Sequence, residues 1–183
     1  MAKTEIDEVL IARARRGDDG AFTALIRRHD DELRALAYRL LGNRTQMDDA
    51  LQEAYVKAYR ALPRFRGDAA FGTWLYRIVY NACLDALKRT RDVVPLDSVR
   101  ERPDPRPGAG ERIPTRSALA DALAELEPAD RAAVLLVDAQ GFDYRSAGEV
   151  LGVPEGTVAS RLNRARSHLR GALAPHLEGA SNR

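Results

Sequence analysis

Residues 71–83 read FGTWLYRIVYNAC, and this stretch decides the fold class of the first half of the chain. Its apolar side chains recur at i, i+3, i+4, i+7 and i+8, the period of one buried helix face; they are Phe71, Trp74, Leu75, Ile78, Val79, Ala82 and Cys83. The same period runs through residues 33–41, and shorter repeats cover 6–14, 22–26 and 50–62. Because the sequence lacks alternating strand patterns of useful length, we predict an all-α bundle for residues 1–90.

The composition changes sharply after residue 90. Residues 91–116 contain five of the nine prolines together with Gly108 and Gly110. Proline removes an amide donor and restricts the residue before it, so we expect no regular element in this stretch. A segment of this length reaches about 28 Å as a flexible coil and about 86 Å when extended. We therefore predict a Pro-rich flexible linker between two small helical domains.

Residues 117–174 form the predicted second domain, and residues 175–183 are expected to be a frayed tail. Its helical repeats cover residues 119–126, 131–140, 143–151 and 155–173. Pro128 suits a first helical turn, Asp143 is the expected N-cap of the third helix, and Gly152 is its expected C-cap. Only residues 152–154 join the last two helices, which is typical of a helix-turn-helix.

The second helix of this motif has one apolar and one polar face. Val158, Leu162, Ala165 and Leu169 make the apolar face, and Thr157, Ser160, Arg161, Asn163 and Arg164 lie opposite. Residues 155–170 hold four arginines against one glutamate, although the second domain is net acidic. Local positive charge on one exposed helix face indicates contact with DNA. An αα-hairpin with a solvated arginine face is the structural alternative.

Aromatic residues and arginines are interleaved ahead of the linker. Seven of the eleven aromatic residues fall within residues 55–80, together with four arginines. Stacking of a base on an aromatic ring contributes about 1–3 kcal/mol, so this mixture suits single-stranded nucleic acid. Phe71 and Trp74 share the apolar stripe and are better explained as core. The stronger candidates lie off that stripe and are Tyr76, Arg77, Tyr80, Asn81 and Lys88; residues 63–70 could line a pocket for a flipped base.

An acidic face opens the helical repeat at residues 50–62. Thr45 and Asp48 have the spacing of a capping box, which is the favoured interpretation of these two residues. Capping explains Asp49 and Glu53 less well. Together with Gln52, these acidic residues can dock against a basic partner surface through charge-assisted bonds.

The composition excludes several classes of function. The chain has 183 residues, 45% hydrophobic residues and a formal net charge of +2, and no apolar stretch approaches the roughly 20 residues of a membrane span. Its single cysteine and three scattered histidines match no metal-ligand spacing, so we predict no metal and no cofactor. The sequence shows no phosphate-binding loop or nucleophile–base motif, which makes an enzyme the least favoured class. We expect a cytoplasmic protein without membrane insertion.

Three groups of motifs, in the same order along the chain, resemble those of bacterial extracytoplasmic function (ECF) RNA polymerase sigma factors. The motifs are DDALQEAYVKAY (48–59), FRG (65–67), FGTWLYRI (71–78), NACLD (81–85) and GVPEGTVASRL (152–162). The first resembles region 2.2 of that family, the next three resemble regions 2.3 and 2.4, and the last resembles region 4.2. The resemblance spans residues 18–173 apart from the linker.

The resemblance implies a factor that binds core RNA polymerase and directs promoter-specific transcription initiation without covalent chemistry of its own. The implied contacts with the clamp coiled coil of the largest polymerase subunit are Asp48, Asp49, Gln52 and Glu53. The implied contacts with the melted −10 element are Arg64, Phe65, Arg66, Trp74, Arg77, Asn81 and Lys88. The implied contacts with the duplex −35 element are Glu155, Gly156, Thr157, Ser160, Arg161, Asn163 and Arg164.

The resemblance also implies an anti-sigma factor as a partner, although no residue identifies it. About 25 base pairs would separate the two promoter elements by roughly 85 Å, which is near the reach of an extended linker. Ala159 departs from the family, whose members often carry Lys or Arg at that position, so one DNA contact is missing. The main rival function is a dimeric helix-turn-helix regulator that binds duplex DNA without polymerase.

Overall fold

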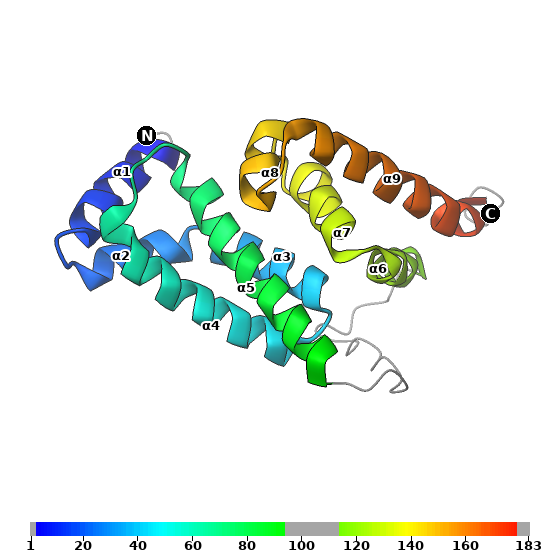
Figure 1. The fold of residues 1–183 in the computed structure, drawn as a ribbon, viewed down its shortest axis with the longest axis horizontal. Coiled ribbons are helices and arrows are strands. Elements are labelled where there is room, and N and C mark those ends of the chain that lie inside the picture. Colours follow the sequence, from blue (N-terminus) through cyan, green and yellow to red (C-terminus); the bar gives the residue numbers. More distant parts are fainter. Residues whose placement is uncertain (1–2, 94–113, 179–183) are drawn as a thin grey trace.

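The computed structural model describes residues 3–93 and 114–178, and all their regular elements are helices (Figure 1). This confirms the predicted all-α class. The first unit contains α1 (Lys3–Ala14), α2 (Asp19–Arg27), α3 (Asp30–Leu41), α4 (Arg44–Ala61), a 3₁₀ turn (Leu62–Arg64) and α5 (Phe71–Val93). The second contains α6 (Pro114–Glu125), α7 (Pro128–Val134), a π-helical turn (Leu135–Ala139), α8 (Tyr144–Leu151) and α9 (Glu155–Glu178).

The apolar face predicted for residues 71–83 forms the centre of the first unit. Leu75, Val79 and Cys83 have no exposed surface, and Phe71 retains only 4%. Helices α3 and α4 pack against α5 on one side, and α8 of the second unit packs on another. Full burial of a Leu or Val side chain contributes about 1.5–3 kcal/mol, so this stripe fixes the position of the helix.

The predicted linker is too long at both ends. Residues 91–93 continue α5, which ends two residues before Pro95, as expected because the residue preceding a proline disfavours helix. Pro114 opens α6, because a proline at the first helical position loses no hydrogen bond. The rest of the predicted linker, residues 94–113, lies outside the described residues.

Two further helix ends differ from the predictions. Asn43 caps α4, because its side chain accepts a hydrogen bond from Gln46 N at 3.0 Å, so the capping box predicted at Thr45 is wrong. Helix α9 continues to Glu178, past the tail boundary expected at residue 175. The helix-favouring residues Ala172, Leu173 and Ala174 extend it, even though Pro175 cannot donate an amide hydrogen bond within it.

The helix-turn-helix has the predicted caps. The Asp143 carboxylate accepts from Ser146 N at 2.7 Å, which lowers the pKa of that carboxyl. Helix α8 ends at Leu151, and its C-cap Gly152 has a φ of 67°, in the left-handed region that favours glycine. Val153 N then donates to the carbonyl of Gly148 at 3.0 Å, and α9 starts after Pro154. The turn therefore brings Val153 directly against the backbone of α8.

The two units pack against each other in one arrangement (Figure 1). Helix α8 lies on α5, while α6 and α7 contact α3. Tyr76 and Tyr80 of α5 are only 2% and 3% exposed. The prediction that these two tyrosines lie off the buried face is wrong, because the second unit covers the side of α5 that faces away from the first bundle.

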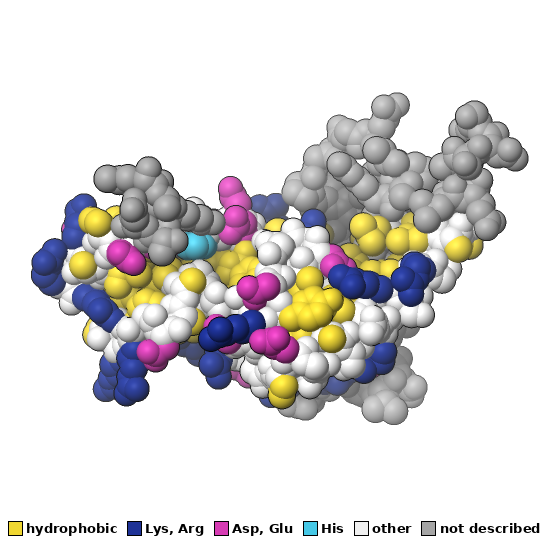
Figure 2. Space-filling view, turned by 90° about the horizontal axis from the view of Figure 1, so that it is seen from above, with side chains coloured by type: hydrophobic (Ala, Val, Ile, Leu, Met, Phe, Trp, Pro, Cys, Tyr) yellow, Lys and Arg dark blue, Asp and Glu magenta, His cyan; other side chains and the backbone are white. Residues whose placement is uncertain are grey.

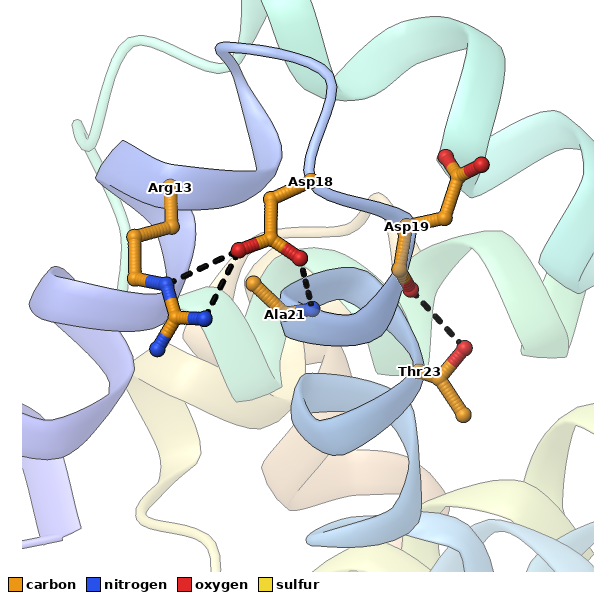
Figure 3. Close-up of polar contacts among 5 residues, drawn as sticks. All are labelled: Arg13, Asp18, Asp19, Ala21 and Thr23. Atoms are coloured by element: carbon orange, nitrogen blue, oxygen red, sulfur yellow. Dashed lines mark hydrogen bonds and ion pairs between the residues drawn. The ribbon is translucent and has the colours of Figure 1, made fainter.

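The turn between α1 and α2 depends on one carboxylate (Figure 3). Asp18 accepts a hydrogen bond from Ala21 N at 2.9 Å, and it accepts two more from Arg13, at 2.9 and 2.7 Å. The hydrogen bond from Ala21, followed by the one from Arg13, lowers the pKa of Asp18 below its ordinary value of 3.8. Asp18 thus caps α2 and joins it to α1.

We expect Gly148→Ala to destabilise the second unit. An added Cβ would lie 2.7 Å from the Val153 carbonyl oxygen, a backbone atom that cannot move without opening the turn. We expect a loss of about 1–3 kcal/mol in the free energy of unfolding, measured by urea denaturation. Gly171→Ala in α9 is the matched control, because nothing lies within 4 Å of its Cβ. Equal stabilities for the two variants would contradict the close approach.

We expect Asp18→Ala to lower the melting temperature at neutral pH. The pKa of Asp18 is lowered in the folded state, so its stabilising effect is complete above the ordinary pKa and is lost as the pH falls through the lowered value. As the pH falls from about 5 to about 3, the melting temperature of the variant should therefore fall less than that of the parent. Thermal unfolding followed by circular dichroism measures this difference. Asp68→Ala, at an exposed loop position, should give a curve parallel to that of the parent.

Candidate functional site

The acidic face of α4 lies at the surface, with Asp48, Asp49 and Gln52 exposed and Glu53 half-buried. Asp48 accepts a hydrogen bond from Arg34 Nη1 at 2.8 Å, and Glu53 pairs with Arg89 of α5 at 3.2 Å. Two of the four carboxylate and amide groups are therefore already oriented by arginines. Asp49 and Gln52 point to solvent between them.

Arg34 belongs to a network that the sequence did not reveal. It also donates to Asp30 at 2.8 Å, and the Tyr55 hydroxyl donates to the other oxygen of Asp30 at 2.6 Å. Burial, followed by the bond to Asp30, raises the pKa of the Tyr55 phenol, so the hydroxyl stays protonated at physiological pH. The network ties the start of α3 to the middle of α4 and holds Asp48 in place.

A groove of about 740 Å³ adjoins the acidic face. Its apolar walls come from α2 and α4 and are Phe22, Leu51, Tyr55, Val56 and Tyr59. Val56 and Tyr59 are 44% and 48% exposed, which is high for large apolar side chains on a small domain. An acidic edge next to an apolar groove suits a partner helix that carries basic and apolar residues on one face.

The cationic candidates for single-stranded DNA share one stripe of α5. Arg77, Asn81 and Lys88 are all exposed and lie at i, i+4 and i+11. Arg64, at the end of the 3₁₀ turn, and Arg66, in the loop before α5, are also exposed. The structure thus brings five of the seven predicted residues to the surface along α5 and its preceding loop.

The two aromatic residues among the predicted −10 contacts, Phe65 and Trp74, are less exposed than the polar ones. Phe65 is only 9% exposed, and its ring packs 5.0 Å from the Trp74 ring and 5.8 Å from the Phe71 ring. Trp74 is half-buried. Phe65 therefore shapes the loop from beneath and does not present its ring to solvent in this conformation.

A basic side chain from the turn after α1 flanks the same loop, and the sequence analysis missed it. The Arg15 guanidinium lies 5.9 Å from the centre of the Phe65 ring, and its Nε donates to the Leu62 carbonyl at 3.5 Å. Figure 2 shows dark blue side chains gathered at the end of the molecule formed by α1 and α2. The run Arg13, Arg15 and Arg16 was visible in the sequence, but its distance of about 50 residues from the loop hid the contact.

The polar residues at the start of α9 face away from the core. Glu155, Gly156, Ser160, Asn163 and Arg164 are exposed, whereas Thr157 and Arg161 are half-buried. The opposite face is buried, as predicted: Val158, Leu162 and Ala165 have no exposed surface. Arg164 makes a bidentate pair with Asp130 of α7 at 2.8 and 2.9 Å. This predicted DNA contact is therefore engaged within its own unit.

Within residues 3–93 and 114–178, no three His, Cys, Asp or Glu side chains form a group that could hold a metal ion. None of the described helices is both long and apolar enough to cross a bilayer.

Comparison with known proteins matches each of the two helical units to a described protein family. Residues 25–93 match the family described as "Sigma-70 region 2", and residues 116–169 match "Sigma-70, region 4". The chain is 42% identical over 165 residues to the "ECF RNA polymerase sigma factor SigM" of Mycobacterium tuberculosis, covering 89% of this chain and 82% of that protein. The chain belongs to the ECF sigma factors. The "ECF RNA polymerase sigma-E factor" of Escherichia coli K12 is 34% identical over 96% of this chain and 98% of its own length.

Solved structures support the same assignment. CnrH, in complex with the cytosolic domain of CnrY, superposes with a TM-score of 0.71 at 27% identity over 93% of this chain and 98% of that one. The sigma factor RpoE of Bartonella quintana, in complex with the anti-sigma factor NepR, gives a TM-score of 0.67 at 28% identity over 84% of this chain and 96% of that one. Both alignments are long enough to include both helical units.

The function of the family follows from its two regions. This ECF sigma factor binds RNA polymerase and directs promoter-specific initiation of transcription. Such factors regulate transcription initiation, and the match over both units favours this function over a dimeric helix-turn-helix regulator.

Proposed function

We propose that the acidic face of α4 and its groove form the docking site for the clamp coiled coil of the largest polymerase subunit. Asp49 and Gln52 supply exposed acceptors, Asp48 is held by Arg34, and the Glu53 pair with Arg89 marks the far edge. The exposed Val56 side chain adds apolar area on the same face. Charge at the rim with an apolar centre is the usual composition of a protein interface.

The stripe on α5 and the loop before it are proposed to hold the melted −10 element. Arg64, Arg66, Arg77 and Lys88 would track the phosphates, and Asn81 would contact a base or sugar. Arg15, in the turn after α1, extends the positive surface beside the loop. Bases captured on this surface are unstacked, so binding favours the opened duplex and assists melting without covalent chemistry.

The start of α9 is proposed to read the −35 element in the major groove. A recognition helix directs its N-terminal residues to base edges, and the exposed Ser160 and Asn163 can hydrogen-bond there. Arg161 would make the principal base or phosphate contact. Glu155, Gly156 and Thr157 would border the backbone, and Arg164 would need to exchange Asp130 for a phosphate.

The observation that carries the proposal is the distribution of the three surfaces. An acidic face beside an apolar groove lies on α4, a polar and cationic stripe lies on α5, and a polar helix start lies on α9 in the other unit. A single chain can therefore contact a protein, a single strand and a duplex with different helices. This arrangement suits a factor that acts in the cytoplasm on polymerase.

We also propose an anti-sigma factor as a partner of this chain. CnrH and the Bartonella RpoE, which share its fold over both units, were solved in complex with CnrY and with the anti-sigma factor NepR. Capture of one protein from a lysate by the full chain, followed by competition with core polymerase, tests this partner.

We expect Asp49→Arg to reduce the affinity for core polymerase. The reversal places a positive charge where a basic partner surface is proposed to dock, and loss of one such pair reduces affinity about tenfold or more. Surface plasmon resonance with immobilised core polymerase measures the affinity. Asp121→Arg, at an exposed position on α6, is the matched charge reversal and should bind like the parent. Equal affinities for both variants and the parent would remove α4 from the interface.

We expect Arg161→Ala to lower run-off transcription from promoters that depend on the −35 element. Loss of one base contact reduces binding by about 1–3 kcal/mol, which corresponds to roughly five- to 160-fold. Arg170→Ala is the control, because it removes the same charge from the same helix two to three turns beyond the motif. The proposal fails at this position if both variants yield as much transcript as the parent.

A further inference from the structure

The residues that line the groove beside α4 carry no net formal charge, although the groove adjoins the acidic face. The charged residues among them are Asp19, Arg34, Asp48 and Arg60, two of each sign. Both carboxylates already accept hydrogen bonds from within the chain: Asp19 from the Tyr59 hydroxyl at 2.8 Å, and Asp48 from Arg34 Nη1 at 2.8 Å. The groove is therefore not simply an acidic surface, and its cations need an explanation of their own.

Arg34 is a cation held in a fixed position at this groove. Its Nε donates to Asp30 at 2.8 Å and its Nη1 donates to Asp48 at 2.8 Å, so carboxylates from α3 and α4 fix the plane of the guanidinium. A guanidinium has five N–H donors in a rigid fork, and the Nη2 group of Arg34 bonds to none of the residues that the structure describes. The Arg34 side chain is 44% exposed, so it can offer that group to an acceptor on a partner.

A second pair of residues anchors Arg34 from below. The Tyr55 hydroxyl donates to the other oxygen of Asp30 at 2.6 Å, so this carboxylate bridges the tyrosine and the arginine. Burial raises the pKa of Asp30, but the bonds from Tyr55 and Arg34 outweigh burial and lower that pKa, so the anchor is ionised at neutral pH. A side chain that is held before binding loses less conformational entropy when it forms an interface contact.

The held cation conflicts with a partner surface that is only basic. A basic residue that approached Asp48 would also approach the fixed charge of Arg34, and like charges that meet in an interface reduce affinity. Arginine is enriched at protein interfaces, where its planar fork pairs with carboxylates in a defined geometry. The surface thus fits a partner that offers a basic residue to Asp49 and an acidic residue to Arg34.

The length of the groove fits a helical partner. From Asp48 to Arg60, α4 lines the groove over about 18 Å, at 1.5 Å per residue. Phe22 of α2 and Val56 of α4 supply apolar walls along it. About three turns of an amphipathic helix match this length, with apolar side chains toward the groove and an acidic side chain at the end where Arg34 lies.

We propose that Arg34 is a direct contact with the docked polymerase helix and that it binds an acidic side chain of that helix. Asp30 and the Tyr55 hydroxyl are positioning groups, because they act on the partner only through Arg34. This inference rests on the proposed docking of the clamp coiled coil at α4. It adds a cation, held in advance, to a site whose other expected contacts are carboxylate or amide groups.

The sign of the effect of Arg34→Gln on affinity tests this contact. We expect about a tenfold or greater loss of affinity for immobilised core polymerase, measured by surface plasmon resonance with the full chain. If the partner is only basic here, removal of the positive charge raises the affinity, and a raised or unchanged affinity overturns the proposal. Arg39→Gln, which removes an exposed arginine farther along α3 and outside the groove, is the matched control and should bind like the parent.

Double variants separate a direct contact from a structural effect. If Arg34 only held Asp48 in place, Arg34→Gln would cause no further loss in an Asp48→Ala chain, whereas we expect the loss to persist there. Tyr55→Phe should weaken binding about threefold in the parent and not at all in the Arg34→Gln chain. The opposite result in either background overturns the role assigned to that residue. Arg34→Lys, which keeps the charge without the fork, should recover part of the lost affinity, and circular dichroism checks that each variant retains its helices.

Salt dependence identifies the chemical class of the acceptor. A contact with an exposed carboxylate is screened, so the ratio of parent affinity to Arg34→Gln affinity should fall between about 0.05 M and about 0.5 M salt. A constant ratio indicates a neutral acceptor and overturns the acidic partner side chain. Asp49→Arg in the same experiment reports on the proposed function. If it binds like the parent, docking at α4 fails; a loss for Asp49→Arg without a loss for Arg34→Gln overturns this inference alone.

Discussion

The burial of α5 is the constraint on which both units depend. Leu75, Val79, Ala82 and Cys83 of its apolar stripe have no exposed surface, because α3 and α4 cover them within the first unit. The second unit covers the neighbouring side, where Tyr76 and Tyr80 lie. A single helix thus contributes to one continuous apolar cluster that runs through both units. Up to residue 91, the exposed residues of α5 are Arg77, Asn81 and the run from Lys88 to Arg91, and α5 offers this surface to a ligand while the units are packed together.

Arginine side chains complete the packing by satisfying helix ends. Arg131 of α7 donates to the Leu40 carbonyl in the last turn of α3, and to the carbonyls of Ala124 and Leu126 at the end of α6. Carbonyls in the last turn of a helix lack intrahelical partners, so one cation serves helix ends from both units. The bond to Leu40 uses the main chain of α3 and does not depend on the side chain there. This contact orients the second unit, while Gln140 and Phe142 contact Tyr76.

Local signals in the sequence were sufficient to predict the individual helices and their ends, but not how the helices pack together. The period of residues 71–83, the Asp143 cap and the Gly152 turn are encoded within a few residues, and all three were predicted. Both Asn43 and Thr45 are good capping residues, and only the extended backbone at Asn43 decides between them. The burial of Tyr76 depends on Phe142 and Gln140, more than 60 residues away, and no periodicity within α5 reports it. The burial of Phe65 has a more local cause: its ring packs against Phe71 and Trp74, which lie across the turn of the loop that leads into α5.

The arginines of α9 show that a basic helix does not by itself indicate a DNA-binding surface, because some of its charges pair within the protein. Arg164 and Arg166 make bidentate pairs with Asp130 of α7 and Asp138 of the π-helical turn, so their charge is largely compensated within the second unit. An arginine that must leave a carboxylate to reach a phosphate contributes less net free energy than one that starts in water. The uncompensated part of the helix is its first two turns, around Ser160 and Arg161. Those turns carry the reading surface, and the later arginines chiefly hold α9 on the scaffold that presents it.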